Sequence, residues 1–168
     1  MWIPLGLASS SGNVLLDGQE SRSRAGNVDG SIIDEDFLSF VVTFNNQPKA
    51  EDWFAVTLDQ PETISRVVLA HGQTFHDGGW FNASAGKPRI QIKAAKDAAW
   101  ETAGELKDYP ATTAADPIGL KGGEKFTCQF STPVKAFAIR VLGKPACGDN
   151  DKQAFASCAE LQAFGGQP

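Results

Sequence analysis

The sequence predicts an all-β domain, built as an antiparallel sandwich or barrel. Apolar and polar residues alternate over short runs along most of the 168-residue chain, which is the period of a strand with one buried face. Gly-, Pro- and Asp-rich turns separate these runs, and no segment keeps a sustained helical stripe. Many short strands and few helices are typical of sandwiches and barrels.

Three expected strands lie in the first hundred residues. In WFAVTL, residues 53–58, every second side chain from Phe54 onward is apolar. RVVLAHG, residues 66–72, is rich in β-branched residues, which favour strands. RIQIKAA, residues 89–95, places its two isoleucines on one face and Gln91 with its charged neighbours on the other. Each run is therefore expected to bury one face.

Three more expected strands follow in the second half of the chain. KFTCQFS, residues 125–131, alternates apolar and polar side chains, so Cys128 is expected in the core as a small inert side chain. AFAIRVLG, residues 136–143, sets alternate apolar side chains against Arg140. CAELQAFG, residues 158–165, alternates its leucine with polar neighbours.

The segments between these runs read as turns and long loops. Residues 95–109 come nearest to a helix, but Gly104 and the polar start of the segment fit a β-turn leading to an exposed Trp100 equally well. Residues 71–88 and 107–124 do not resemble strands, and long loops in compact β-domains are usually functional or mobile. No repeat or internal boundary is visible, so we expect one domain.

The composition restricts the partners. Acidic residues exceed basic ones by 5 and no basic tract occurs, which argues against nucleic acid or an anionic membrane as the main partner. No apolar run is long enough to span a bilayer. Residues 1–12 have an apolar patch without a basic region, a poor signal peptide. We expect a domain cut from a longer secreted protein, the alternative being a complete cytosolic one.

The remaining cysteines flank a polar loop. Cys147 and Cys158 lie on either side of GDNDKQAFAS, and a disulfide between them would tie this loop to the final strand. If it forms, the compartment is oxidising. The alternative is that all three cysteines are reduced thiols.

The acidic segment AGNVDGSIIDEDF, residues 25–37, suggests a cation site. Ca²⁺ takes oxygen ligands from carboxylates, amides and carbonyls. Asp29 precedes a glycine that permits a tight turn, Asp34 lies five residues on, and Asn27 offers a further oxygen. The spacing is not that of an EF-hand, so an ordinary acidic loop or part of an active site are alternatives.

Several segments together resemble a known family. They are the N-x-D-G loop, WFAVTLDQPETISRVVL, RIQIKAAKDAAW, AFAIRVLG and the closing SCAELQAFG. In order and spacing they resemble the discoidin, or coagulation factor V/VIII C-type, domain, whose bacterial relatives are the carbohydrate-binding modules of family 32. The resemblance covers roughly residues 20–165. It implies an antiparallel jelly-roll β-sandwich of the galactose-binding type, with about eight strands.

The resemblance also implies a structural calcium ion between the early loop and the last strand. Asp29 matches the loop aspartate of the family, and Glu160 matches its terminal glutamate. Asn27 would supply a carbonyl oxygen. Where the family often has Thr or Ser, this chain has Asp34, which keeps an oxygen ligand and adds charge. The ion would pin the two ends of the domain and would not catalyse.

A second candidate site lies in the loop of residues 71–87. Sugar sites need an aromatic ring that stacks on the apolar face of a pyranose and a few directional polar groups. The residues that could supply them are His76, Asp77, Trp80, Phe81 and Asn82. The alternative is that the aromatic side chains of this loop, Phe75 and Trp80 among them, fold back onto the core.

The function implied by the resemblance is that of a non-catalytic carbohydrate-binding module. It would target an associated enzyme to an oligo- or polysaccharide, as a monomeric domain of a secreted or cell-surface bacterial protein. A protein- or cell-adhesion module of the same fold is one alternative. A stand-alone enzyme is another, with His71 or His76 and Asp77 as general base. No G-x-S-x-G, H-E-x-x-H, P-loop or C-x-x-C motif supports catalysis.

Overall fold

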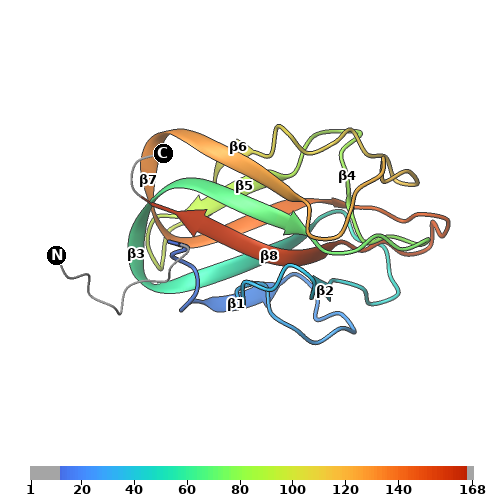
Figure 1. Cartoon of the computed structure of the whole chain (residues 1–168), viewed down its shortest axis with the longest axis horizontal. Coiled ribbons are helices and arrows are strands. Elements are labelled where there is room, and N and C mark those ends of the chain that lie inside the picture. Colours follow the sequence, from blue (N-terminus) through green and yellow to red (C-terminus); the bar gives the residue numbers. More distant parts are fainter. Residues whose placement is uncertain (1–11, 166–168) are drawn as a thin grey trace.

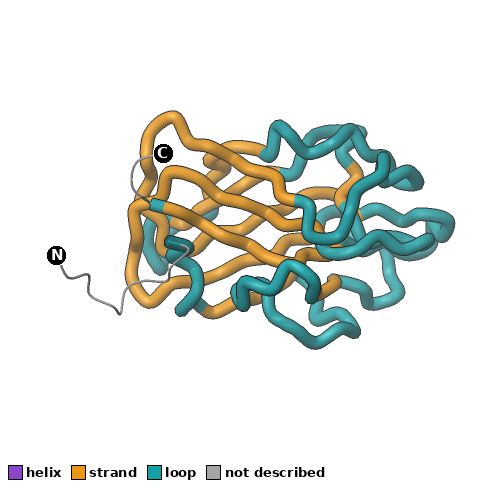
Figure 2. Tube along the Cα trace, viewed as in Figure 1, coloured by secondary structure: helices purple, strands orange, loops and turns teal. Residues whose placement is uncertain are grey.

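The fold is all-β, as the sequence predicts. A computed structural model describes residues 12–165, and these residues contain no helix (Figure 2). No helix among them is therefore long and apolar enough to cross a membrane. The strands are β1 (Gln19–Arg22), β2 (Val41–Val42), β3 (Asp52–His71), β4 (Phe81–Asn82), β5 (Arg89–Lys93), β6 (Glu101–Glu105), β7 (Lys125–Pro145) and β8 (Ser157–Phe164).

Two long strands bend and belong to both layers of the sandwich. The first half of β3 pairs with β1 and with the second half of β7, whereas its second half pairs with β8 and the first half of β7. The register of β3 against β7 shifts between Thr57 and Glu62, where a bulge permits the bend. Figure 1 shows both strands arching around the same end of the molecule.

All strand pairs are antiparallel. The hydrogen-bonded order is β2-β8-β3-β7-β5-β6, with β1 added to β3 and β4 added to β7. One layer therefore contains β1, β5 and β6 with one half of each bent strand, and the other contains β2 and β8 with the other halves. This arrangement is the predicted antiparallel sandwich.

The predicted strands differ from the observed ones mainly in how they join. Residues 53–58 and 66–72 are the two arms of β3, and residues 125–131 and 136–143 are the two arms of β7. Exposed polar residues between the arms looked like turns in the sequence, but they form the outer side of the bends. Within 95–109 the turn interpretation holds, since β6 follows the turn and pairs with β5.

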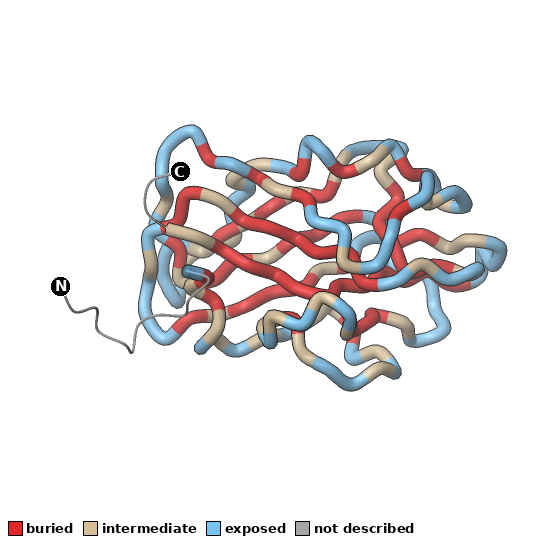
Figure 3. The backbone as a smooth tube through the Cα atoms, in the orientation of Figure 1, coloured by how far each residue is buried: buried red, intermediate tan, exposed pale blue. Residues whose placement is uncertain are grey.

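The core lies between the layers and is made by the inward side chains of the alternating runs. Phe54 and Val56 of β3, Ile90 of β5 and Ile139 of β7 are fully buried. Figure 3 shows that the buried stretches run mainly along the strands. Burying each such side chain stabilises the fold by about 1.5–3 kcal/mol. Cys128 is also buried, which confirms its predicted place in the core.

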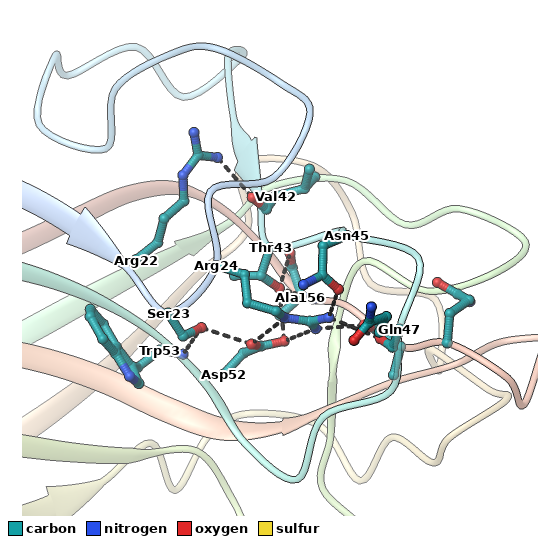
Figure 4. Close-up of polar contacts among 12 residues, drawn as sticks. Arg22, Ser23, Arg24, Val42, Thr43, Asn45, Gln47, Asp52, Trp53 and Ala156 are labelled. Carbon is teal, nitrogen blue, oxygen red and sulfur yellow. Dashed lines mark hydrogen bonds and ion pairs between the residues drawn. The ribbon is translucent and has the colours of Figure 1, made fainter.

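An ion pair is buried at the end of the sandwich where the long loops gather (Figure 4). Arg24, just after β1, places Nη2 2.6 Å from Oδ2 of Asp52 at the start of β3, and its Nε donates to Oδ1 at 3.0 Å. Both side chains are almost fully buried. Thr43 Oγ1 donates to the same carboxylate at 2.8 Å, and Ser23 Oγ at 2.7 Å. Every oxygen of the carboxylate therefore has partners.

The remaining donors of Arg24 connect further loops. Its Nη1 donates to Asn45 Oδ1 and to the carbonyl of Gln47, at 2.6 and 2.9 Å. Its Nη2 also reaches the carbonyl of Ala154 at 2.6 Å, in the segment before β8. The pair thus joins the chain after β1, after β2, at the start of β3 and before β8.

We predict that Asp52→Asn destabilises the domain by about 3–5 kcal/mol, because it leaves the Arg24 charge buried without a full partner. Urea denaturation followed by tryptophan fluorescence measures this loss. Asp59→Asn, at an exposed position of the same strand, is the matched control and should change stability by no more than about 0.5 kcal/mol. Equal stability of the two variants would contradict the role given to the pair.

Candidate functional site

A groove with aromatic walls opens at the loop end of the sandwich. It has a volume of about 210 Å³. We call it the phenylalanine groove, and it is lined by Asn27, Val28, Val42, Phe44, Phe75, Asp77 and Phe155. The lining residues come from four separate parts of the chain, so the groove exists only in the folded domain.

The rings of the groove form a continuous row. Phe155 lies at the middle, with its ring centroid 5.2 Å from that of Phe44 and 5.8 Å from that of Phe75. Phe40 extends the row, 5.9 Å from Phe75. Phe75 is 38% exposed, so its ring is available at the surface. Such a row can offer flat apolar faces to a ligand.

The buried ion pair fixes the position of two of these rings. Phe44 follows Thr43, whose hydroxyl accepts from the backbone N–H of Ala156 at 3.0 Å and whose N–H donates to the Ala156 carbonyl at 3.1 Å. Phe155 lies between Ala154, held by Arg24, and this Ala156. The backbone on either side of both rings is therefore anchored.

The turn of residues 75–79 lies close to Phe155 and places the ring of Phe75 in the groove. The N–H of Phe75 donates to the carbonyl of Gly78 at 2.8 Å. Gly78 has a φ of +140°, and a Cβ there would come within 2.8 Å of the Phe155 ring. Glycine is required at this point both by the backbone angle and by the contact.

The polar side chains of the groove form no hydrogen bond within the described part of the chain, although the charge of Asp77 acts on neighbouring His76. Asn27 and Asp77 make no side-chain hydrogen bond or ion pair there, although the Asp77 carbonyl accepts from Gln153 Nε2 at 2.5 Å. The two side chains thus keep their donors and acceptors available beside the rings. A few such groups next to apolar walls are typical of small-molecule sites.

His76 lies outside the groove lining. Its Nδ1 is 2.9 Å from Oδ2 of Asp149, and both side chains are largely exposed. The hydrogen bond to Asp149 and the charge of that carboxylate raise the pKa of His76. The N–H of Asp149 also donates to the His76 carbonyl, so the pair connects two loops at the surface.

Three residues predicted to contact a ligand are buried instead. Trp80 is only 2% exposed, and its indole N–H donates to the Thr113 carbonyl at 2.9 Å. Phe81 packs against the core rings, and Asn82 Oδ1 accepts from the N–H and hydroxyl of Ser84. The pairing of β4 with β7 draws this segment inward. The expectation of ligand contact is therefore corrected for Trp80, Phe81 and Asn82, and among the predicted ligand residues Asp77 lines the groove.

Of the four predicted calcium ligands, the structure brings two together, Asp34 and Glu160. Glu160 of β8 is fully buried, and its Oε1 accepts from the N–H of Asp34 at 3.0 Å. Its Oε2 has no hydrogen-bond partner. Burial, and then the neighbouring Asp34 carboxyl, raise the pKa of Glu160 to about 9. A buried carboxylate oxygen without a partner is costly unless a proton or a cation neutralises it.

The other two predicted ligands lie elsewhere. Asn27 and Asp29 are exposed and form no hydrogen bond with Glu160 or Asp34, and Asn27 lines the phenylalanine groove. Within residues 12–165, no group of three or more His, Cys, Asp and Glu side chains is arranged to hold a metal ion. The intervening segment is fastened by Glu20, which accepts from the Ser31 hydroxyl and the Ile32 N–H.

The disulfide predicted between Cys147 and Cys158 is not formed. All three cysteines are free thiols. Cys158 is fully buried in β8 opposite Val41, whereas Cys147 follows β7 and its thiol approaches the Gly148 carbonyl at 3.7 Å. The bridge between Ala146 and Phe155 holds Cys147 beside the segment before β8.

Sequence reasoning missed Phe44 and Phe155. Both are single aromatic residues in polar loops, without a periodic pattern around them. The available signal is indirect. Asp52 lies two residues before Phe54 and four before Val56, so its side chain points to the same buried face of the strand. A carboxylate that points into the core requires a buried partner. Tracing that partner to Arg24 would have indicated which loops meet.

Comparisons with known proteins support the fold. No protein-family model and no curated protein matches the chain. Among solved structures, a family 32 carbohydrate-binding module from a family 31 glycoside hydrolase of Clostridium perfringens aligns with a TM-score of 0.67 and 16% identity, covering 94% of this chain and 97% of that one.

Two further structures align over similar lengths. The family 32 module of C. perfringens NanJ, in complex with galactose, gives a TM-score of 0.63 at 18% identity, covering 90% of this chain and 96% of the other. Chitosan-binding module 1 from a chitosanase/glucanase of Paenibacillus sp. IK-5 gives 0.59 at 18% identity, covering 91% and 98%. The chain therefore has the galactose-binding-like sandwich fold of family 32 modules.

We predict that Trp80→Ala destabilises the domain by about 3–5 kcal/mol, the usual loss for removing a buried Trp. The reason is the cavity left behind and the lost bond to the Thr113 carbonyl. Thermal or urea denaturation measures it. Trp100→Ala, at a half-buried surface position, should be less costly, and a Trp80 variant as stable as the wild type would mean that the ring is not a core element.

Proposed function

We propose that this chain is a carbohydrate-binding module without catalytic activity and that the phenylalanine groove holds the glycan. The observation that carries the proposal is the combination of a surface ring, Phe75, with the unpaired polar side chains of Asn27 and Asp77 in one groove. A pyranose has an apolar face for the ring and hydroxyls for the polar groups. The sugar-binding neighbours of the same fold support the proposal.

The size of the groove limits the ligand. At about 210 Å³ it is smaller than the roughly 300–1,000 Å³ of typical small-molecule pockets. It suits one sugar unit, such as a chain end or a side branch, more than a long stretch of polysaccharide. Contacts beyond that unit would come from the surrounding loops.

The polar groups of the site suit binding more than hydrolysis. Glycoside hydrolysis generally needs two carboxyl groups on opposite sides of the scissile bond, and within residues 12–165 Asp77 is the one carboxylate that lines the groove. His76, the candidate general base, pairs with Asp149 and lies outside the lining. A targeting role, in a longer secreted or cell-surface bacterial protein, belongs to the same proposal.

An adhesion module is the second candidate. Leu38 is 91% exposed and Ile118 is 50% exposed, on loops outside the groove lining. Exposed large apolar side chains are a feature of surfaces that bind proteins. In this alternative the partner would contact these loops, and the rings of the groove would be secondary.

We also propose a structural calcium ion at Glu160 and Asp34. The buried Oε2 of Glu160 lacks a partner, and the Asp34 carboxyl lies beside it. Ca²⁺ is satisfied by carboxylates together with backbone carbonyls and water, so two acidic side chains are compatible with such a site. The ion would neutralise both carboxylates and fasten the 27–34 segment to β8.

For the glycan proposal we predict that Phe75→Ala weakens binding by at least about fivefold, the loss of roughly 1 kcal/mol expected for a stacking residue. Because Phe75 is partly exposed, stability should change little. An oligosaccharide array identifies the ligand, and titration calorimetry measures the change.

Leu38→Ala is the matched control, since it removes an exposed apolar side chain outside the groove lining. It should leave glycan binding intact. An intact wild-type domain that binds no glycan on the array, together with a protein partner lost on Leu38→Ala, would favour the adhesion module.

For the calcium proposal we predict a pH-dependent stability that Glu160→Gln removes. The pKa of Glu160 is about 9 in the folded chain against 4.5 for the ordinary side chain. Between these values the folded state holds one more proton than the unfolded state, so metal-free stability should fall as pH rises from 5 to 9. Added Ca²⁺ should oppose that fall, because it binds the ionised carboxylate.

Chemical denaturation in EDTA and in millimolar CaCl₂, at several pH values, measures both effects. Glu160→Gln should show neither the pH slope attributed to this carboxyl nor the calcium response, whereas Asp36→Asn, in the same acidic segment, should keep both. A wild-type domain with identical stability in EDTA and in CaCl₂ at pH 8 would contradict the proposed ion.

A further inference from the structure

We infer that the phenylalanine groove selects an amino sugar that carries a free ammonium group, in preference to neutral, N-acetylated or acidic sugars. The inference rests on the proposed glycan binding and concerns the ligand class of the same groove. It starts from the charges of the lining: among the lining residues that the structure describes, Asp77 is the one acid and no Lys or Arg occurs.

The carboxylate of Asp77 is available to a ligand. It forms no hydrogen bond or ion pair with another described residue, and its own backbone is held by Gln153 through the Asp77 carbonyl. A half-buried carboxylate without a protein partner favours an incoming cation. An incoming carboxylate, as in a uronic acid, would be repelled by the same group.

The rings beside Asp77 favour the same ligand. Phe44, Phe75 and Phe155 line the groove together, and the faces of aromatic rings attract ammonium groups. An amino sugar therefore interacts favourably with the rings and with the carboxylate. Its own ring stacks on Phe75, and its ammonium group lies between the Asp77 carboxylate and the faces of the aromatic rings. An N-acetyl group offers neither the charge nor the compact shape.

The basic side chains near the groove are engaged by other groups. His76, next to Asp77 in the chain, pairs with Asp149, whose hydrogen bond and charge, followed by the charge of Asp77, raise the pKa of His76. Arg24 is neutralised by Asp52 beneath the loops. Arg22 donates to the carbonyls of Val42 and Val28, and it lines a separate pocket with Glu20.

Two further acids lie near the groove. Asp29 follows the lining residue Val28, and Asp149 neighbours the turn that carries Asp77 and pairs with His76. The chain as a whole has a net charge of −5. Such a field attracts cationic glycans over its whole surface and raises their rate of encounter.

The test is calorimetric titration of the full chain with matched oligosaccharides at pH 5.5 and low ionic strength. The probes are a β-1,4-linked glucosamine tetramer, its fully N-acetylated counterpart, a galacturonate tetramer and lactose. The wild type should bind the glucosamine tetramer at least tenfold more tightly than the other three. The preference should shrink as salt is added, because the exposed charges are screened.

Two variants identify the origin of the preference. Asp77→Asn keeps the shape of the side chain and should reduce the preference for the amine over its N-acetylated counterpart to about twofold. Phe75→Leu keeps an apolar side chain without a π face and should lower affinity for the amine more than for its N-acetylated form. Asp151→Asn, an exposed acid on the neighbouring loop, is the control and should keep the full preference.

The outcomes separate the inference from the proposed function. Equal or tighter binding of the N-acetylated or neutral probe overturns the amino-sugar inference and leaves glycan binding standing. A full preference retained by Asp77→Asn overturns the assignment to this carboxylate. If no glycan binds at all, on these probes or on an array, the proposed function fails together with the inference.

Discussion

The buried pair of Arg24 and Asp52 is the interaction on which the loop end of this sandwich depends. Its two side chains are removed from water, which is costly for charges unless geometry and hydrogen bonds compensate. Here the compensation is nearly complete, because the carboxylate also accepts from Ser23 and Thr43 and the guanidinium reaches the carbonyls of further loops. We expect a charge pair of this kind to contribute more to the choice of one loop arrangement than to net stability.

This choice of arrangement creates the phenylalanine groove. Thr43 and Ala154 are bound by the pair or its partners, and each is next in sequence to a ring of the groove. The rings Phe44 and Phe155 are therefore placed by backbone bonds on either side of them, and Phe75 completes the row from a turn that packs against Phe155. A ligand in the proposed groove would contact all of these loops, so its binding energy would add to the stability of the folded arrangement.

The sequence predicts the layers far better than the loops. Alternation is a local property, so it predicts the arms of β3 and β7 correctly, whereas it predicts turns where the two strands bend. Phe75 and Trp80 are five residues apart, and distant parts of the chain determine how deeply each side chain is buried. Trp80 directly precedes β4, which pairs with β7, whereas Phe75 lies in a turn that packs against Phe155. No local pattern distinguishes two aromatic residues in one glycine-rich loop, and the cysteines that flank a loop in sequence likewise face different surroundings.

The acidic segment after β1 connects the groove to the proposed ion. One of its ends supplies Asn27 and Val28 to the groove, and the other places Asp34 against buried Glu160. Between them the chain is held by Arg22 at the Val28 carbonyl and by Glu20 at Ile32, so the segment is short and fastened at several points. An ion at Glu160 would therefore act on the glycan without touching it, by fixing the backbone that presents Asn27. Its effect on affinity would come through the order of this segment, and it would be lost when the Glu160 carboxylate is replaced.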